Sequence, residues 1–284
     1  MHRDFRLLLS SLCDLSPHKT LNPTVDIVVV SYNCLEYLKK CINSIEQHTD
    51  YPFTLTIVDN ASTDGTQEYL QTLSQVKVII NSSNRGYGQA CNQGAKAGVG
   101  DFILFLNADT EATPGWLSPL VQCFQTDPRI AVVGPKLVNY DNKIVGAGVV
   151  GANAAPKLRG WLTPDGPQQF TMQMDCLSVC GAAYMIRRDL INDLGLFDEH
   201  YFFYFEETDY SYNARYKRYR VVYCPASRMY HALAASSQGK APEELRELFT
   251  QSERYFNEKW SEFLKEERTY GEDETTAGGG NDRP

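Results

Sequence analysis

The sequence lacks the marks of several protein classes. Its 284 residues contain no dense run of Lys and Arg, and the formal net charge is -8. Nucleic-acid-binding proteins hold phosphates with clustered cations, so this charge argues against a nucleic-acid partner. The 8 cysteines include no C-x-x-C pair. We therefore expect reduced, buried thiols, as in cytosolic proteins, with neither a zinc site nor a disulfide framework.

Long apolar runs are missing as well. The leucines at residues 7–9 are too few for a signal peptide or a membrane span. We expect a cytoplasmic protein in which any membrane contact is peripheral, at the inner face of the membrane. The apolar fraction of 43% is still enough for a sizeable core, and the length allows one large domain or two small ones.

The turn after the first predicted strand has no glycine. This strand, Val25–Val30, leads into Ser31-Tyr32-Asn33-Cys34. A dinucleotide-binding fold places G-x-G-x-x-G at that position, so the sequence disfavours a nicotinamide-dependent dehydrogenase. A nucleotidyltransferase would need a Gly-rich loop with a Lys there, and it is disfavoured for the same reason. A mononucleotide-type ligand fits this turn better.

Apolar strands alternate with helices through the first half of the chain. The predicted strands are residues 25–30, 55–58, 76–80 and 102–106. Alternation at this spacing predicts an α/β fold with a mostly parallel sheet and right-handed connections. Polar residues, among them Asp59 and Asn107, follow directly where the strands end. Because ligands bind beyond the carboxyl ends of such strands, we expect a nucleotide-type crevice at this edge.

The strand Phe102–Leu106 reads as buried on both faces and stops at Asn107-Ala108-Asp109. Asp109 would project into the crevice, where carboxylates and substrate phosphates together can hold Mg²⁺ or Mn²⁺. The alternative is that Asn107 and Asp109 only form an Asx turn before the next helix. Asp59 has two interpretations in the same way, as an acceptor for a base or a ribose hydroxyl, or as a turn residue.

Glu206, Glu207 and Asp209 crowd three carboxylates into one turn at a predicted helix start. Favourable interaction with the helix dipole would explain them by itself. The aromatic residues 201–205 would, however, supply a wall of low polarity, and burial with like charges raises a carboxyl pKa toward the range of a general base. His231 follows the next predicted strand and could be structural or a ligand.

Two later segments have open interpretations. A loop rich in Gly and Pro surrounds Trp161, and a long loop in a compact domain is more often a functional lid than a tether. Trp161 could stack on a sugar ring or anchor the loop. Residues 242–265 form a predicted amphipathic helix that packs on the body or contacts a membrane or partner. Its apolar side holds Leu245, Leu248, Phe249, Phe256, Trp260 and Phe263.

Several motifs occur in the order found in one known enzyme family. They are Asp59-Asn60-Ala61-Ser62-x-Asp64-Gly65-Thr66, Asn84-Arg85-Gly86-Tyr87-Gly88-x-Ala90-x-Asn92-x-Gly94, Asn107-Ala108-Asp109, and Phe197-Asp198-Glu199 with Phe205-Glu206-Glu207-x-Asp209. Together they resemble glycosyltransferase family 2, and within it the rhamnosyltransferase-like enzymes. The resemblance implies a GT-A type α/β fold, with flanking helices and a smaller mixed sheet on the acceptor side. It also implies inverting transfer from a nucleoside-diphosphate sugar.

Changes of pattern along the chain, taken together with the resemblance, divide it. Residues 24–134 would be the nucleotide-binding half and 135–240 the acceptor-binding and catalytic half of a domain spanning 24–240. An N-terminal arm, 1–23, precedes it. The amphipathic helix, 241–265, and an acidic, Gly-rich tail, 266–284, follow, and we expect the tail to be disordered.

Single residues take roles from the resemblance. Those on the nucleotide side are Ser31, Asn33, Asp59, Asn84, Arg85, Gly86 and Asn107. Asp109 ends the D-x-D motif, and His231 is similar to the histidine that completes the metal site for Mg²⁺ or Mn²⁺. Gly181 and Ala182 match the segment that lines the donor sugar and acceptor, and the loop interpretation above adds Trp161 to that side.

Glu207 takes the position of the catalytic base, with Glu206 and Asp209 as substitutes. Two positions depart from the family pattern, because Asn107 begins the D-x-D motif and Glu207 stands where Asp is usual. The implied reaction uses a UDP- or dTDP-linked sugar and a hydroxyl of a glycan, a lipid-linked or another acceptor. The alternative is a sugar-nucleotide-binding protein of the same fold that has lost turnover.

Overall fold

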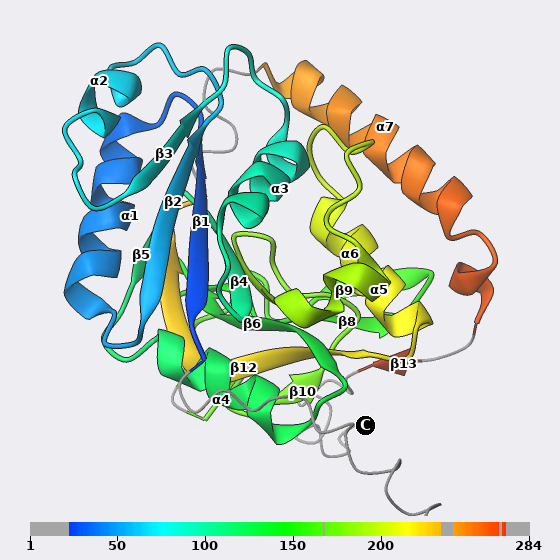
Figure 1. Ribbon diagram of the computed structural model, residues 1–284. Helices are drawn as coiled ribbons and strands as arrows, with labels where there is room; N and C mark the ends of the chain where they lie inside the picture. The colour runs from blue at the N-terminus through cyan, green and yellow to red at the C-terminus, as the bar shows by residue number, and fades with distance from the viewer. Residues whose placement is uncertain (1–22, 167, 234–240, 267–268, 271–284) are drawn as a thin grey trace, which may run out of the picture.

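The computed structural model describes residues 23–166, 168–233, 241–266 and 269–270 (Figure 1). The predicted arm therefore lies outside the described residues, apart from Pro23. In chain order the first elements are β1 (Val25–Ser31), α1 (Leu35–His48), β2 (Phe53–Asp59), α2 (Thr66–Leu70), β3 (Lys77–Ile80), α3 (Tyr87–Ala97), β4 (Phe102–Asn107), β5 (Thr110–Ala112) and α4 (Leu117–Thr126). The later elements are β6 (Ile130–Val138), β7 (Ile144–Gly146), β8 (Val149–Ala152), β9 (Ala155–Leu158), β10 (Met174–Asp175), β11 (Ala183–Arg187), α5 (Ile191–Leu194), α6 (Glu206–Tyr216), β12 (Arg220–His231), α7 (Pro242–Lys259) and β13 (Thr269–Tyr270).

The central sheet runs in the order β10-β12-β6-β11-β4-β1-β2-β3. The strands β4, β1, β2 and β3 pair in parallel, as the alternation of strands and helices predicted. On the other side β11 pairs antiparallel with both β4 and β6, because its chain returns from the acceptor half in the opposite direction. The α/β prediction is confirmed, and parallel pairing is concentrated in the N-terminal half.

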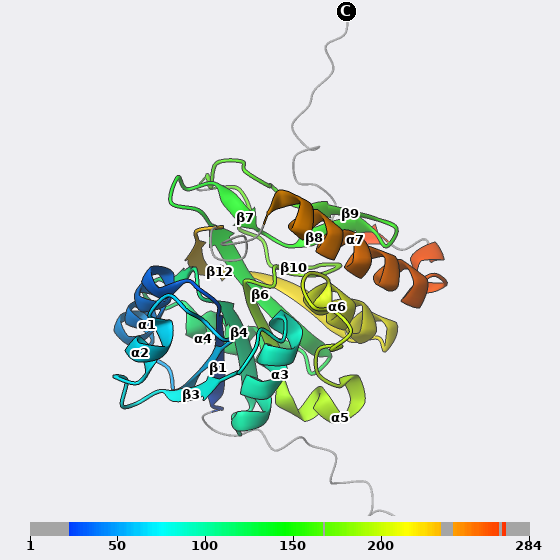
Figure 2. The same ribbon diagram turned by 90° about the horizontal axis from the view of Figure 1, so that it is seen from above.

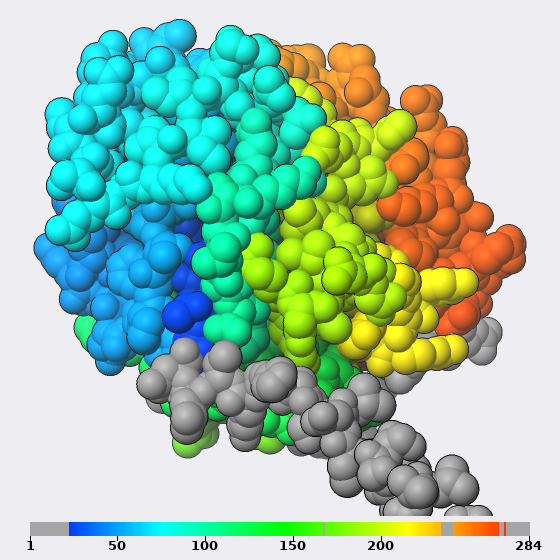
Figure 3. Space-filling model, in the orientation of Figure 1, coloured from blue at the N-terminus to red at the C-terminus, as the bar shows by residue number. Residues whose placement is uncertain are grey.

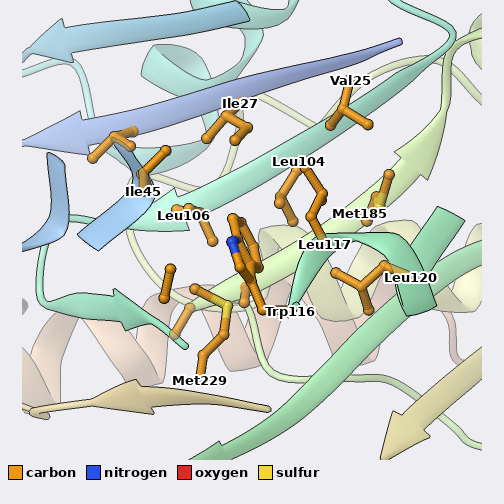
Figure 4. Packing of buried hydrophobic residues seen from close by; sticks show 14 of the residues in the cluster. Val25, Ile27, Ile45, Leu104, Leu106, Trp116, Leu117, Leu120, Met185 and Met229 are labelled. Carbon is orange, nitrogen blue, oxygen red and sulfur yellow. The ribbon is translucent and has the colours of Figure 1, made fainter. Parts of the chain in front are cut away.

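Both faces of the sheet are covered by helices, which explains the uninterrupted apolar strands. Along β4, Leu104 and Leu106 pack with α1 and α4 on one face, whereas Ile103 and Phe105 pack with α3 and α6 on the other. Figure 4 shows Trp116 among the buried side chains of the first face. The sheet is thus held rigid from both sides, and its strand ends are fixed in space.

A smaller antiparallel sheet, β13-β8-β9, lies on the acceptor side. Seen from above, α7 lies beside α6 (Figure 2), and aromatic side chains of the two helices pack together. The predicted helix of 241–265 ends at Lys259, although Phe263–Lys265 continues as a 3-10 turn. The expectation of a disordered tail is wrong at Thr269 and Tyr270, which pair with β8. The other tail residues lie outside the described residues, apart from Glu266.

Strand register decides which polar residues meet. Ser31 is level with Asp59 across β1 and β2, and Val30 is level with Asn107 across β1 and β4. At the far end of β12, His231 pairs with Thr110 of β5, directly after Asp109. Residues separated by more than a hundred positions are therefore brought to one edge of the sheet.

Candidate active site

A cavity of about 420 Å³ opens at this edge, between the two halves of the chain. That volume is in the range of small-molecule sites. It brings together most of the predicted site residues: Asn84, Gly86, Asn107, Trp161, Gly181, Ala182, Glu206, Glu207 and His231. Further lining residues are Val30, Tyr32, Cys34, Asn60, Tyr87, Ala108, Cys180, Phe202, Phe203, Tyr204 and Leu233.

Asp59 is fully buried at the end of β2. Its Oδ2 accepts hydrogen bonds from the Ser62 amide and the Gln67 side chain, both at 3.0 Å. Its Oδ1 has no hydrogen-bond partner in the described part of the chain. A buried carboxylate oxygen without a donor is costly, so this atom suits a donor supplied by a ligand.

The other residues on the nucleotide side are tied to one another. Asn33, at φ +49°, accepts a hydrogen bond from the Thr63 amide at 2.7 Å and so joins the β1 and β2 turns. Asn84 accepts from the Gly86 amide at 2.9 Å, and Asn60 donates to the Gly86 carbonyl at 3.0 Å. These contacts build the nucleotide side of the cavity before any ligand arrives.

Four of the predicted nucleotide residues do not line the cavity: Asn33 and Asp59, described above, and Ser31 and Arg85. Ser31 is fully buried beneath it, with its hydroxyl 3.4 Å from the Cys34 thiol. Arg85 is exposed, and its amide donates to Asn60 at 3.4 Å. Ser31 therefore supports the floor of the site, and the Arg85 guanidinium lies at its margin.

Asp109 and His231 form the candidate metal pair. Both are buried, and His231 Nε2 lies 3.4 Å from Asp109 Oδ1. Neither ring nitrogen of His231 has a hydrogen-bond partner among the described residues. A cation between the two side chains would satisfy an imidazole nitrogen and a carboxylate, so the residues fit Mg²⁺ or Mn²⁺. No third His, Cys, Asp or Glu joins them within the described ranges, which leaves the remaining positions to phosphate oxygens or water.

Glu206 and Glu207 open α6 and face the cavity. Burial, followed by the charge of Glu207, raises the pKa of Glu206 well above its ordinary value. Burial also raises the pKa of Glu207. Phe205 begins this helix with φ +73°, a left-handed conformation that turns the two carboxyls inward from the aromatic segment. The predicted wall of low polarity is present, because Phe202, Phe203 and Tyr204 line the same cavity.

Gly181 and Ala182 lie between Glu207 and the sheet. A Cβ on Gly181 would lie only 3.0 Å from Glu207 Cγ, so glycine leaves the space that this side chain occupies. The Ala182 carbonyl accepts from the Asn107 amide at 3.0 Å. The Tyr87 hydroxyl donates to the Gly181 carbonyl at 3.2 Å. Glu207 is thereby held at a fixed place relative to β4 and α3.

Asp209 does not join the cavity. It accepts hydrogen bonds from Tyr201, Lys259 and Trp260 at 3.1, 2.9 and 2.8 Å. These partners fasten α6 to α7, on the side of the helix away from Glu207's cavity. This placement argues against Asp209 as a substitute base, since its oxygens are already engaged.

Trp161 stands at the mouth of the cavity with 42% of its surface exposed. A residue that anchored its loop would be buried, so the anchoring interpretation is not supported. Phe202 and Leu233 share the mouth and are 39% and 38% exposed. The entrance therefore has an apolar rim made from three separate segments.

Sequence reasoning missed several lining residues. Tyr87 belonged to a recognised motif, and its phenol could have been marked as a donor beside a glycine-rich turn. Asn60 was not proposed as a site residue because its neighbour Asp59, which ends β2, was chosen instead. Cys180 and Leu233 carried no signal, because only tertiary structure brings them to the cavity.

Comparisons with known proteins agree with this architecture. The sequence model of Glycosyl transferase family 2 matches residues 26–195, more than half of the chain. N-acetylglucosaminyl-diphospho-decaprenol L-rhamnosyltransferase of Mycobacterium tuberculosis is 26% identical over 250 residues, covering 78% of this chain and 80% of that protein. The O-antigen biosynthesis protein RfbC of Myxococcus xanthus is 29% identical over 230 residues, covering 77% of this chain and 18% of that protein.

Solved structures show the same fold. GalNAc-T7 with UDP, GalNAc and Mn2+ superposes with a TM-score of 0.67 at 22% identity, covering 86% of this chain and 50% of that chain. The mannosyltransferase PcManGT from Pyrobaculum calidifontis, in complex with GDP-Man and Mn2+, gives a TM-score of 0.55 at 18% identity, with 86% and 72% covered. The GT-A fold prediction is confirmed. With the matched segment spanning the strand ends described above, the chain belongs to glycosyl transferase family 2.

Proposed function

We propose that this protein transfers a sugar from a nucleoside-diphosphate sugar, UDP- or dTDP-linked, to an acceptor hydroxyl with inversion at the anomeric carbon. One observation carries the proposal. A single cavity is lined by Asn107, by His231, which lies 3.4 Å from Asp109, and by Glu207. A leaving diphosphate beside the Asp109–His231 pair and an acceptor hydroxyl beside Glu207 would then share one cavity.

The nucleotide would lie along the ends of β1, β2 and β4. Asp59 Oδ1 would accept from an N–H of the base, since it is the buried acceptor there that needs a donor. Asn84 and Gly86 form the adjoining wall. Uracil and thymine both offer an N–H between two carbonyls, which is why we prefer these bases.

Glu207 would act as the general base. It would take the proton from the acceptor hydroxyl as the oxygen attacks the anomeric carbon and the bond to the diphosphate breaks. The raised pKa of Glu207 brings its basicity closer to neutral pH than that of an exposed carboxylate. A divalent cation held by Asp109 and His231 would offset the charge of the leaving diphosphate.

The acceptor would be a lipid-linked sugar. The Mycobacterium tuberculosis relative carries a lipid diphosphate in the name of its acceptor. The apolar rim of Trp161, Phe202 and Leu233 would tolerate the first part of such a chain at the cavity mouth. No helix in the described part of the chain is both long and apolar enough to cross a bilayer. Because a lipid-linked acceptor is held in a membrane, we propose that the protein acts in the cytoplasm, in peripheral contact with the inner face of the membrane.

Binding and turnover can be tested separately. Nucleotide sugars with uracil, thymine or guanine bases are screened for thermal stabilisation of the protein, with and without Mn²⁺. We expect a metal-dependent rise with UDP- or dTDP-sugars. The stabilising donor is then incubated with a panel of lipid-linked and free glycans, and the anomeric configuration of any product is read by NMR.

The outcomes separate the hypotheses. Release of nucleoside diphosphate that depends on an acceptor supports an enzyme, and an inverted product supports the single displacement. Donor binding without turnover with any acceptor would identify a non-catalytic binding protein. A retained anomeric configuration would contradict the role of Glu207 as base.

A further inference from the structure

The turn that carries Trp161 is fixed at its base and exposed at its tip. Trp161 and Leu162 are 42% and 47% exposed, and Leu162 has φ +59°, a costly conformation for a branched side chain. Backbone hydrogen bonds join this turn to β7, from the Leu162 amide to the Ile144 carbonyl and from the Ile144 amide to the Thr163 carbonyl, both at 2.8 Å. The predicted lid is therefore a fixed wall.

One carboxylate ties the end of this turn to the sheet. Asp165 lies 2.9 Å from Lys136 Nζ of β6 and 3.4 Å from Arg228 Nε of β12. The Asp165 and Lys136 side chains are only 12% and 9% exposed. Arg228 also donates to Asn142 at 2.8 Å, and the Asp165 amide donates to the Asn142 carbonyl at 2.8 Å. We call Lys136, Asp165 and Arg228 the ion-pair triad.

The start of the turn is fixed independently. Gly160 has φ +67°, and a Cβ there would lie 2.4 Å from the ring of Phe170. The neighbouring guanidinium of Arg159 stacks over Phe170 and Tyr223, at 4.9 and 5.6 Å. Buried contacts on both sides thus hold a strained turn in place, and their evident result is the position of one indole at the cavity mouth.

The wall next to Trp161 belongs to the acceptor. The nucleotide side of the cavity is built from the ends of β1, β2 and β4, whereas Trp161 comes from the C-terminal half, with Gly181 and Glu207. A general base must contact the attacking hydroxyl, so the substrate on this side is the one that supplies it. The flat apolar face of an indole suits the C–H face of a sugar ring.

We propose that Asp165, acting through the ion-pair triad, is a positioning residue that holds Trp161 as the acceptor-binding wall. This inference rests on the proposed function for the identity of the substrate, but the triad and the turn can be tested without any substrate. Replacing Asp165 removes both ion pairs, frees the end of the turn, and lets the indole leave the cavity mouth.

Trp fluorescence provides a direct measurement. The chain has 3 tryptophans, and Trp116 and Trp260 are only 1% and 8% exposed, so acrylamide quenches mainly Trp161. In the substrate-free protein, Asp165→Asn is expected to raise the quenching constant about twofold. Asp127→Asn is the matched control, because Asp127 also pairs with two arginines, Arg129 and Arg220, but does not contact this turn. It should leave the quenching constant unchanged.

Kinetics with the acceptor that supports turnover gives the second measurement. Asp165→Asn and Trp161→Ala should each raise the acceptor KM about tenfold, with the donor KM and the kcat at saturating acceptor within about twofold of wild type. Because Trp161→Ala changes an exposed side chain, it remains informative if Asp165→Asn does not fold. Arg228→Gln, which keeps the closer Lys136 pair, should give an intermediate change.

The results distinguish the two proposals. Unchanged quenching in a folded Asp165→Asn protein would overturn the positioning role. An increase in the donor KM alone in Trp161→Ala would assign the wall to the donor and also overturn the inference. Absence of nucleotide-sugar binding by the wild-type protein would refute the proposed function, while the quenching experiment would still report on the ion-pair triad.

Discussion

The N-terminal part of the chain, blue and cyan in Figure 3, lies beside the C-terminal part, yellow to orange, and the two sides of the cavity that they form are built differently. On the nucleotide side, Asn33, Asn60 and Asn84 each have a hydrogen-bond partner within the protein. A buried oxygen of Glu206, next to Glu207, and both ring nitrogens of His231, beside Asp109, have none among the described residues, and the same holds for Asp59 Oδ1. The asparagines are thus satisfied within the protein, whereas Asp59, Glu206 and His231 keep atoms that a substrate or cation would satisfy.

The two sides also differ in the residues that adopt a left-handed backbone conformation. The left-handed residues of the nucleotide side are Asn33 and Ala61, which are small. Around the acceptor side they are large: Leu162, Tyr204, Phe205 and Leu233. Large side chains in this conformation cost of order 1 kcal/mol or more each. The large side chains in this conformation therefore gather in the C-terminal half, around the wall of the cavity that carries Glu206 and Glu207.

The largest expected effect is a loss of kcat in a variant of the acceptor side that still binds the donor. Glu207→Gln keeps the size of the side chain and removes the base, so kcat should fall about 10²–10⁴-fold while donor binding is retained. Initial rates of nucleoside-diphosphate release and donor-induced thermal shifts measure the two properties. Full activity in this variant would exclude Glu207 as base.

The same carboxyl predicts a pH dependence. Because burial raises the pKa of Glu207, the ionised form needed for catalysis is lost at a higher pH than for an exposed Glu. The rate should therefore fall on the acid side before ordinary carboxylates titrate. A pH–rate profile whose acid limb follows an ordinary Glu pKa would contradict this expectation.

His231→Ala tests whether the unsatisfied imidazole serves a cation. We expect a loss of about 10²-fold in kcat, equal to about 2.7 kcal/mol, and loss of the Mn²⁺-dependent part of thermal stabilisation by UDP. His200→Ala is a control, since His200 stacks on Tyr255 at 4.4 Å, away from the cavity lining. Equal metal dependence in wild type and His231→Ala would reject the metal role.

The unfolding free energy tests the contact between Gly86, on the nucleotide side, and Phe202, on the acceptor side. A Cβ on Gly86, at φ +83°, would lie 2.4 Å from the Phe202 carbonyl oxygen, so Gly86→Ala should lower the unfolding free energy by about 2–4 kcal/mol. Gly115 has φ +73° with nothing within 4 Å, and Gly115→Ala should cost only about 1 kcal/mol. Urea unfolding gives both values. Equal losses would show that the contact with Phe202 is unimportant.

The smallest expected effect is on the pH dependence of stability, and it comes from the buried carboxyl of Glu206. Since its pKa is raised in the folded protein, its stabilising contribution is complete below the ordinary Glu pKa and is lost as the pH rises through the folded pKa. Glu206→Gln should therefore gain stability relative to wild type with rising pH, by at most about 1.4 kcal/mol per pH unit.

Glu199→Gln should change the pH dependence of stability in the opposite direction. Hydrogen bonds from Asn92 and Gln89 lower the pKa of Glu199, so its contribution is present above the ordinary Glu pKa and is lost as the pH falls through the folded pKa. Urea unfolding over a pH series should thus show Glu206→Gln gaining and Glu199→Gln losing stability at neutral pH. The same sign for both variants would contradict this assignment.

The nucleotide side could be predicted from sequence because its signals are local. Apolar runs ending at Ser31, Asp59 and Asn107 belong to parallel strands, and parallel strands place their carboxyl ends at one edge. The motifs around Gly86 and Asp109 follow along the chain in the order expected for the family, which supported the same prediction. Here pattern and topology agree, so little tertiary information was needed.

The acceptor side depends on contacts between distant residues. Asp209 looked like a third carboxylate of the site, but Lys259, 50 positions later, engages it from α7. The helix start expected at these carboxylates is found at Glu206, but the left-handed conformation of Phe205 before it is one that propensity does not predict.

The contact between Asp209 and α7 has a consequence for how the protein can be shortened. Asp209 and Glu207 share the first turn of α6, and Lys259 and Trp260 hold that turn from outside. Residues beyond the family match therefore support the helix that carries Glu207. A protein ending before Pro242 would retain every residue of the cavity described here, but the first turn of α6 would lose its contacts with Lys259 and Trp260.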